Sequence, residues 1–77
     1  MKIVCIALNT MEKVNSFIRD MEGVEGEAVI CSGRYCVNAK SAMSIFTLNL
    51  TKPMSLRIEN WKDEYAALLQ KYMFVPG

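Results

Sequence analysis

The spacing of apolar residues changes several times along the chain, and these changes limit the possible folds more than any other feature. In KIVCIAL (residues 2–8) apolar side chains fill both alternating sets of positions, which predicts a strand at the centre of a sheet. Farther on, helical spacing relates four apolar residues: Val14, Phe17, Ile18 and Met21. We therefore expect a strand followed by an amphipathic helix.

Polar residues predict where this first helix begins and ends. Asn9 is followed three residues later by Glu12, which is the spacing of a capping box. We expect Asn9 to cap a helix from about Thr10 to Met21, and Gly23 to end it.

Two short apolar runs separated by Ser32-Gly33-Arg34 predict a β-hairpin. If Gly33 and Arg34 form the two-residue loop, Cys31 lies opposite Cys36. If Ser32 and Gly33 form it instead, the cysteines are out of register. The sequence leaves both registers open.

The second half of the chain predicts two more helices and another strand. Ser41, a favoured N-cap residue, should begin a second helix that carries Met43, Ile45, Phe46 and Leu48, although the periodicity of this segment alone fits a helix or a strand. The alternating segment 54–58 reads as a half-buried strand. Residues 61–73 carry an apolar stripe, acidic residues in the first turn and Lys71 in the last, as expected for a helix. The order β-α-β-β-α-β-α predicts a single α+β domain over residues 1–77, with a four-stranded antiparallel sheet covered on one face by three helices.

Composition excludes several kinds of chemistry. The chain has no histidine, so it lacks the commonest metal ligand and the usual general base near neutral pH. Nine basic and eight acidic residues give a net charge of +1, so the chain lacks the excess of positive charge that is typical of nucleic-acid-binding proteins. Because the sequence also shows no nucleophile–base pair or phosphate-binding loop, we expect no enzyme activity, no metal and no cofactor.

The cysteines and the N-terminal segment predict a cytoplasmic protein. No apolar run approaches the roughly 20 residues that would span a bilayer, and the N-terminal apolar stretch is too short for a signal peptide. Three cysteines cannot all pair within the chain, which favours reduced thiols. Cys31 and Cys36 are interpreted as apolar thiols on a sheet, with a cross-strand redox pair or half of a metal site as alternatives.

Three segments resemble one known family. They are VNAKS (residues 37–41) before a short helix, LNLTKPMSLRI (residues 48–58) after it, and a final helix that opens with Lys-Asp-Glu. Together with the order of elements, they resemble HPr, the histidine-containing phosphocarrier of the bacterial phosphoenolpyruvate-dependent sugar phosphotransferase system. The resemblance covers nearly the whole chain and implies an HPr-like open-faced β-sandwich.

The resemblance also implies that the family's carrier chemistry is absent. HPr proteins carry an active-site histidine between the first strand and the first helix, and an arginine two residues later. Thr10 stands at or near the histidine position and Glu12 near the arginine position. A carboxylate there would repel a phosphate, and a phosphothreonine is too stable an ester to pass its phosphoryl group on.

Ser41 matches a second site of the family. In HPr proteins of low-GC Gram-positive bacteria, the corresponding serine is phosphorylated by an ATP-dependent kinase, and the phosphorylated protein acts as a corepressor in catabolite control. Ser41 is therefore a candidate phosphorylation site, with a helix cap alone as the alternative. The resemblance also implies a partner-docking surface around it, made of Lys40, Ala42, Met43, Ile45 and Phe46.

These observations predict a regulatory or protein-interaction module that binds proteins of the phosphotransferase system or of catabolite control, with no direct contact to nucleic acid or membrane. Two alternatives stay open. One is a phosphocarrier that uses another acceptor residue. The other is a structural domain that forms homodimers through the open sheet face or its edge.

Overall fold

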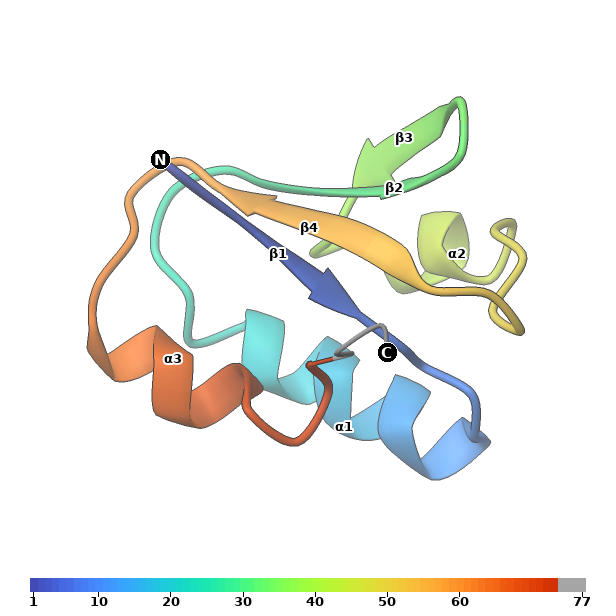
Figure 1. The fold of residues 1–77 in the computed structure, drawn as a ribbon, viewed down its shortest axis with the longest axis horizontal. Helices are drawn as coiled ribbons and strands as arrows, with labels where there is room; N and C mark the ends of the chain where they lie inside the picture. The colour runs from blue at the N-terminus through green and yellow to red at the C-terminus, as the bar shows by residue number, and fades with distance from the viewer. Residues whose placement is uncertain (74–77) are drawn as a thin grey trace.

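The computed structural model describes residues 1–73, and it confirms the expected order of elements (Figure 1). The four strands are β1 (Lys2–Ile6), β2 (Ala28–Ser32), β3 (Tyr35–Asn38) and β4 (Met54–Ile58). The three helices are α1 (Met11–Met21), α2 (Ala42–Ile45) and α3 (Glu64–Leu69). The fold is α+β, as predicted.

The strands form one antiparallel sheet in the order β1-β4-β2-β3. The prediction that residues 2–8 form a central strand is wrong, because β1 lies at an edge and β4 lies inside the sheet. Ile3 is 58% exposed on the outer face of β1, and Cys5 on the same face is also exposed. Part of the β1 edge is covered by the chain after α3: Ala7 N donates to the Tyr72 carbonyl at 2.8 Å, and Ile6 pairs with Met73.

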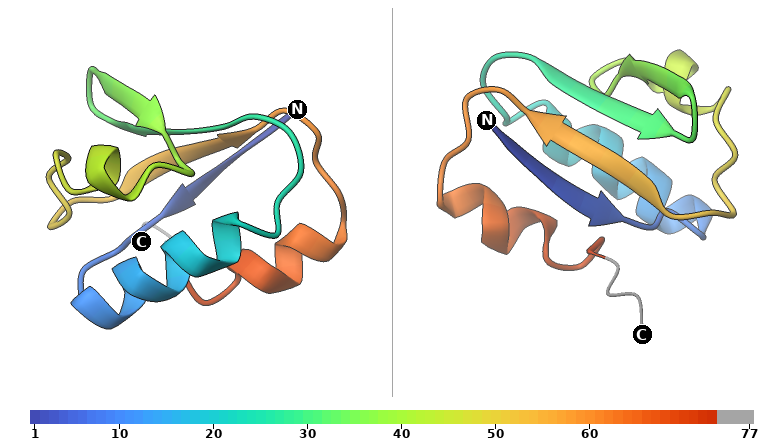
Figure 2. Two further views of the ribbon diagram at one scale, coloured as in Figure 1. Left: turned by 180° about the vertical axis from the view of Figure 1, so that it is seen from behind. Right: turned by 45° about the horizontal axis from the view of Figure 1, so that its top comes forward.

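One face of the sheet forms the core together with the helices. Figure 2 shows α1 and α3 on one side of the strands, with α2 beside β3 at the end of the sheet. The alternation in β4 buries every second residue, so Met54, Leu56 and Ile58 point into the core while Ser55 and Arg57 point to the open face. The helical spacing predicted for α1 is confirmed, with Val14, Phe17 and Met21 buried and Ile18 packed against them.

The cap predicted for α1 is wrong by one residue. Thr10, not Asn9, is the N-cap, and its hydroxyl accepts a hydrogen bond from Lys13 N at 3.2 Å. Both residue types satisfy free amides at a helix start, so composition did not distinguish them.

The last two helices are shorter than predicted. α2 is a single turn that ends at Ile45, and α3 leaves Trp61 and Lys71 outside its bounds. The bond from Ala7 N to Tyr72 aligns the chain after α3 with β1, so it leaves the helical path there. Tyr72 still reaches the core: its ring meets Phe17 edge to face, and its hydroxyl donates to Asp20 Oδ2 at 2.7 Å.

The hairpin adopts the first of the two open registers. Cys31 pairs with Cys36 and Ser32 with Tyr35, so Gly33 and Arg34 form the loop. Gly33 has a φ of 61°, the conformation that the first loop residue of a type II′ turn requires and that glycine adopts without steric cost.

The expectation of reduced thiols is wrong for two of the three cysteines. Cys31 and Cys36 form a disulfide with an S–S distance of 2.05 Å, and Cys5 is a free, exposed thiol. The reason is the register: directly opposite residues project to the same face of the sheet with their Cβ atoms in bonding range.

Candidate functional site

Ser41 begins α2 and caps it, as predicted. Its backbone is extended (φ −100°, ψ 109°), and its Oγ accepts a hydrogen bond from Ser44 N at 3.4 Å. The preceding turn is held by Asn38, whose side-chain oxygen accepts from Lys40 N at 2.9 Å and whose carbonyl accepts from Ser41 N at 3.1 Å. These bonds place a half-buried serine hydroxyl at a defined position at the start of α2.

The residues after Ser41 divide into an anchor and an exposed pair. Ile45 is fully buried in the core, so the prediction that it contacts a partner is wrong. In a one-turn helix only one side chain reaches the sheet, and here it is Ile45. Met43 is 84% exposed and Phe46 is 48% exposed. We call Met43 and Phe46, with the exposed Lys40 and the half-buried Ala42, the α2 face.

The start of α1 lies at the same end of the molecule. Figures 1 and 2 show the β1–α1 loop and α2 at one end of the sheet in all three views. Thr10 and Glu12 are exposed there, and Met11, the first residue of α1, is 58% exposed. Met11 was missed at the sequence level, although an apolar residue in the first turn, off the buried stripe, was a usable signal.

Thr10 is occupied as a cap and is poorly suited to phosphate transfer. Its Oγ accepts from Lys13 N, and Glu12 lies two residues away with an exposed carboxylate. A phosphate on Thr10 would meet this negative charge.

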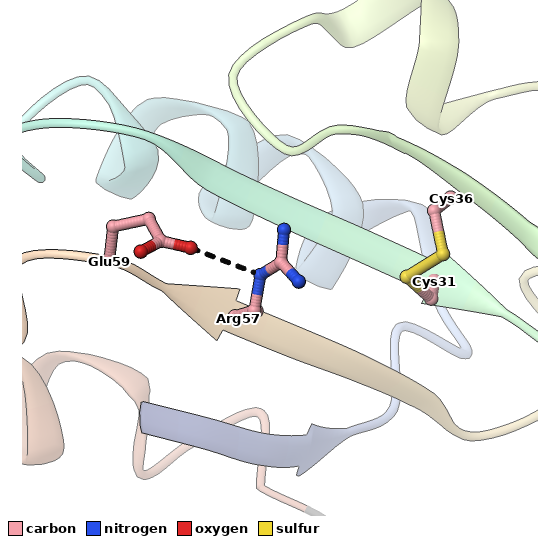
Figure 3. The surroundings of a disulfide bond; sticks show 4 residues. All are labelled: Cys31, Cys36, Arg57 and Glu59. Carbon is pink, nitrogen blue, oxygen red and sulfur yellow. Dashed lines mark ion pairs between the residues drawn. A yellow bond between two sulfur atoms is a disulfide. The ribbon is translucent and has the colours of Figure 1, made fainter. Parts of the chain in front are cut away.

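A second group of reactive side chains lies on the open face of the sheet. The registers place Cys5 opposite Ser55, Ser55 opposite Cys31, and Cys31 opposite Cys36, so one row across all four strands carries three sulfur atoms. Figure 3 shows the disulfide at the end of the β2–β3 hairpin, with Arg57 on the same side of the sheet. Arg57 is paired with Glu59 at 3.3 Å. The sequence analysis allowed a cross-strand pair of Cys31 and Cys36 only as an alternative, because it left the hairpin register open. It did not predict the row, which depends on the order of the strands.

No protein-family model matches the chain, and no curated protein sequence matches it. Of the helices in residues 1–73, none is long and apolar enough to cross a membrane. The same residues contain no group of three or more cysteine, aspartate or glutamate side chains arranged to hold a metal ion.

Proposed function

We propose that this chain is an HPr-like protein that has lost phosphotransfer and acts as a cytoplasmic regulatory or protein-interaction module. The observation that carries the proposal is the exposure of Met43 and Phe46 on a turn anchored by Ile45 and begun by Ser41. Large apolar side chains exposed to water on a hydrogen-bonded turn suit a surface that another protein covers.

The fold supports the family part of the proposal. An antiparallel sheet with helices in the order β-α-β-β-α-β-α agrees with the arrangement that the resemblance to HPr implies. The turn from Asn38 to Ser41, within the segment of closest resemblance, is held by two hydrogen bonds to Asn38 and leads into the α2 face.

Ser41 would act as the switch of this surface. Transfer of the γ-phosphoryl group of ATP to its Oγ would place nearly two negative charges next to Lys40 in the chain and at the start of the turn that exposes Met43 and Phe46. The phosphate would then strengthen binding of a partner with a positively charged surface and weaken binding of one with a negatively charged surface.

The proposal is tested by intact mass after incubation with ATP and an HPr-directed serine kinase. We expect one added phosphate, which is absent in Ser41→Ala and is formed more slowly in Met43→Glu. Ile3→Thr is the matched control, because Ile3 is an exposed apolar residue outside the α2 face. No phosphate on the wild type, or equal rates in Met43→Glu and wild type, would contradict the proposal.

A parallel incubation with phosphoenolpyruvate and Enzyme I tests the loss of carrier chemistry. We expect no added phosphate. A phosphate that disappears in Thr10→Ala would show instead that the threonine has replaced the histidine as acceptor.

A further inference from the structure

We propose that the Cys31–Cys36 disulfide is a site of reversible S-thiolation at Cys36 by a small zwitterionic thiol, such as cysteine or a short cysteine-containing peptide. Two observations carry this inference: the accessibility of one sulfur of the bond, and a groove beside that sulfur with charges of both signs. It shares Lys40 with the α2 face but does not depend on Ser41, on the exposed Met43 and Phe46, or on the family resemblance.

Access differs between the two cysteines. β3 is the edge strand opposite β1 and Cys36 is exposed, whereas Cys31 lies one strand farther in and is half-buried. An attacking thiolate must approach a sulfur from the side opposite its bonded partner. For Cys36 this is the outer edge of β3, with which no other strand of residues 1–73 pairs, and for Cys31 it is the side occupied by β4 and Ser55. Cys36 is therefore the sulfur open to attack.

The groove beside Cys36 has a volume of about 390 Å³. Val29 and Asn38, which pair with each other next to the disulfide, are part of its lining. Lys40 supplies a cation and Glu27 an anion, and both side chains are exposed. A lysine and a carboxylate around an apolar patch match a ligand that carries both a carboxylate and an ammonium group beside its thiol.

The reaction is an exchange of one disulfide for another. The ligand thiolate attacks Cys36 Sγ, a bond forms between these sulfur atoms, and the Cys31–Cys36 bond breaks with its electron pair moving to Cys31 as a thiolate. A second ligand thiolate then attacks the ligand sulfur, releases Cys36 as a thiolate and yields the ligand disulfide. Excess ligand disulfide drives both steps backwards.

Arg57 is placed to help the leaving sulfur. It lies on β4 opposite Val29 and on the same face as the disulfide, which makes it a diagonal neighbour of Cys31 (Figure 3). Diagonal positions of this kind are within reach of a long side chain, and a nearby guanidinium stabilises a thiolate. Arg57, although paired with Glu59 at 3.3 Å, thus adds positive charge to the side of the sheet that carries Cys31.

The experiment uses the full chain with Cys5→Ser, so that the two remaining cysteines are those of the hairpin. Glutathione is the probe and 2-mercaptoethanol the uncharged comparison, at equal thiolate concentration. We expect acid-quenched samples to carry one glutathionyl group that maps to Cys36. Glutathione should react with Cys36 faster than 2-mercaptoethanol does. Lys40→Gln should lower the rate with glutathione about fivefold, because one charge a few ångströms away in water contributes an energy of this order. Lys52→Gln, which removes an exposed lysine outside the groove, should leave the rate unchanged.

The mixed disulfide of Cys36 with glutathione can be short-lived, because the free Cys31 thiolate can attack it. Two variants that each keep one cysteine of the hairpin remove this reaction. With glutathione disulfide as the probe, the Cys31→Ser variant, which keeps Cys36, should be thiolated faster than the Cys36→Ser variant, which keeps Cys31. Faster reaction at Cys31, equal rates with the charged and uncharged thiols, or a disulfide that survives millimolar glutathione would each overturn the proposal.

Discussion

At the scale of single residues, Asn9 and Thr10 at the start of α1 are both suited to cap a helix, but only Thr10 does so. Thr10 accepts the bond from Lys13 N, while Asn9 lies outside the cap. Thr10→Ala should therefore lower the free energy of unfolding by about 1 kcal/mol, the usual value of an N-cap. Asn9→Ala, the matched control, should change it by less than about 0.5 kcal/mol. Urea unfolding measures both values, and a larger loss in Asn9→Ala would restore the capping box predicted from sequence.

Tyr72 provides a second test at this scale, through its pKa. Burial raises the pKa of this phenol above its ordinary value of 10.0, and the hydrogen bond to Asp20 raises it further. The folded protein therefore keeps a proton that the unfolded chain releases above about pH 10, so the stability contributed by Tyr72 is complete below that pH and declines above it.

Tyr72→Phe should remove both the bond and this pH dependence. We expect a loss of about 1.5 kcal/mol near neutral pH, at the low end for a bond to a charged group because Asp20 retains Lys71 at 3.1 Å. Between about pH 9 and pH 11 the variant should lose less stability than the wild type, measured by urea unfolding at each pH. Tyr35→Phe, at an exposed tyrosine, is the control. If the wild type and Tyr72→Phe lost stability equally as the pH rose, the raised pKa of Tyr72 would not explain the pH dependence.

At the scale of elements, the disulfide is a small contributor to stability. It closes a loop with a sequence separation of only five residues, for which the chain-entropy relation gives about 2 kcal/mol. Reduction should lower the free energy of unfolding by about this amount in the Cys5→Ser background and leave the far-ultraviolet spectrum unchanged, because β2 also pairs with β4. Unfolding of the domain on reduction would show that the bond is structural.

The elements also show what the sequence could predict. Strict alternation over residues 54–58 and helical spacing over residues 14–21 led to the correct element types, because each pattern reflects local contact with one core. The edge position of β1 and the early end of α3 were missed. Both depend on pairing between segments far apart in the chain, such as Ala7 with Tyr72, which local periodicity does not record.

The candidate site was predictable to the same degree. Ser41 was recognised as a cap because its preference is local, and Met43 is exposed as a docking residue requires. The burial of Ile45 was not predicted, since it depends on the length of α2 and its angle to the sheet. The cysteine row could not be predicted from the sequence for a related reason. Cys5 and Cys31 share one row across the sheet because β4 lies between β1 and β2, and local patterns do not record this strand order.

At the scale of the whole molecule, the two ends of the sheet differ. The end that carries α2 exposes apolar side chains, whereas at the other end the α1–β2 and β4–α3 loops are tied together (Figure 1). There Lys62 Nζ lies 2.9 Å from Glu25 Oε2, and this ion pair lowers the pKa of Glu25. Glu25 N donates to Tyr65 Oη at 3.0 Å, and Glu59 N donates to the Glu27 carbonyl at 3.1 Å. This tied end holds α3 against the sheet and leaves the opposite end available for contacts.

Gly26 lies within the tied end and tests how closely the loops approach. It has a φ of 79°, and a Cβ at this position would collide with the side-chain amide of Asn60. Gly33 has a φ of 61° but faces open space, so it is the matched control. We expect Gly33→Ala to lower the free energy of unfolding by about 1 kcal/mol, because it places a side chain on a left-handed backbone. Gly26→Ala should lower it by about 2 to 3 kcal/mol, because the collision with Asn60 adds to this effect. Urea unfolding measures both values.

The double variant Gly26→Ala/Asn60→Ala isolates the contact between the two loops. If the collision with Asn60 accounts for the excess, the cost of Gly26→Ala measured in the Asn60→Ala background should fall to that of Gly33→Ala. Equal costs for Gly26→Ala and Gly33→Ala in the wild-type background would mean that the Asn60 side chain moves aside freely. The loops would then be joined mainly by the bonds of Glu25, Glu27 and Glu59, and the tied end would depend on polar contacts rather than on close packing.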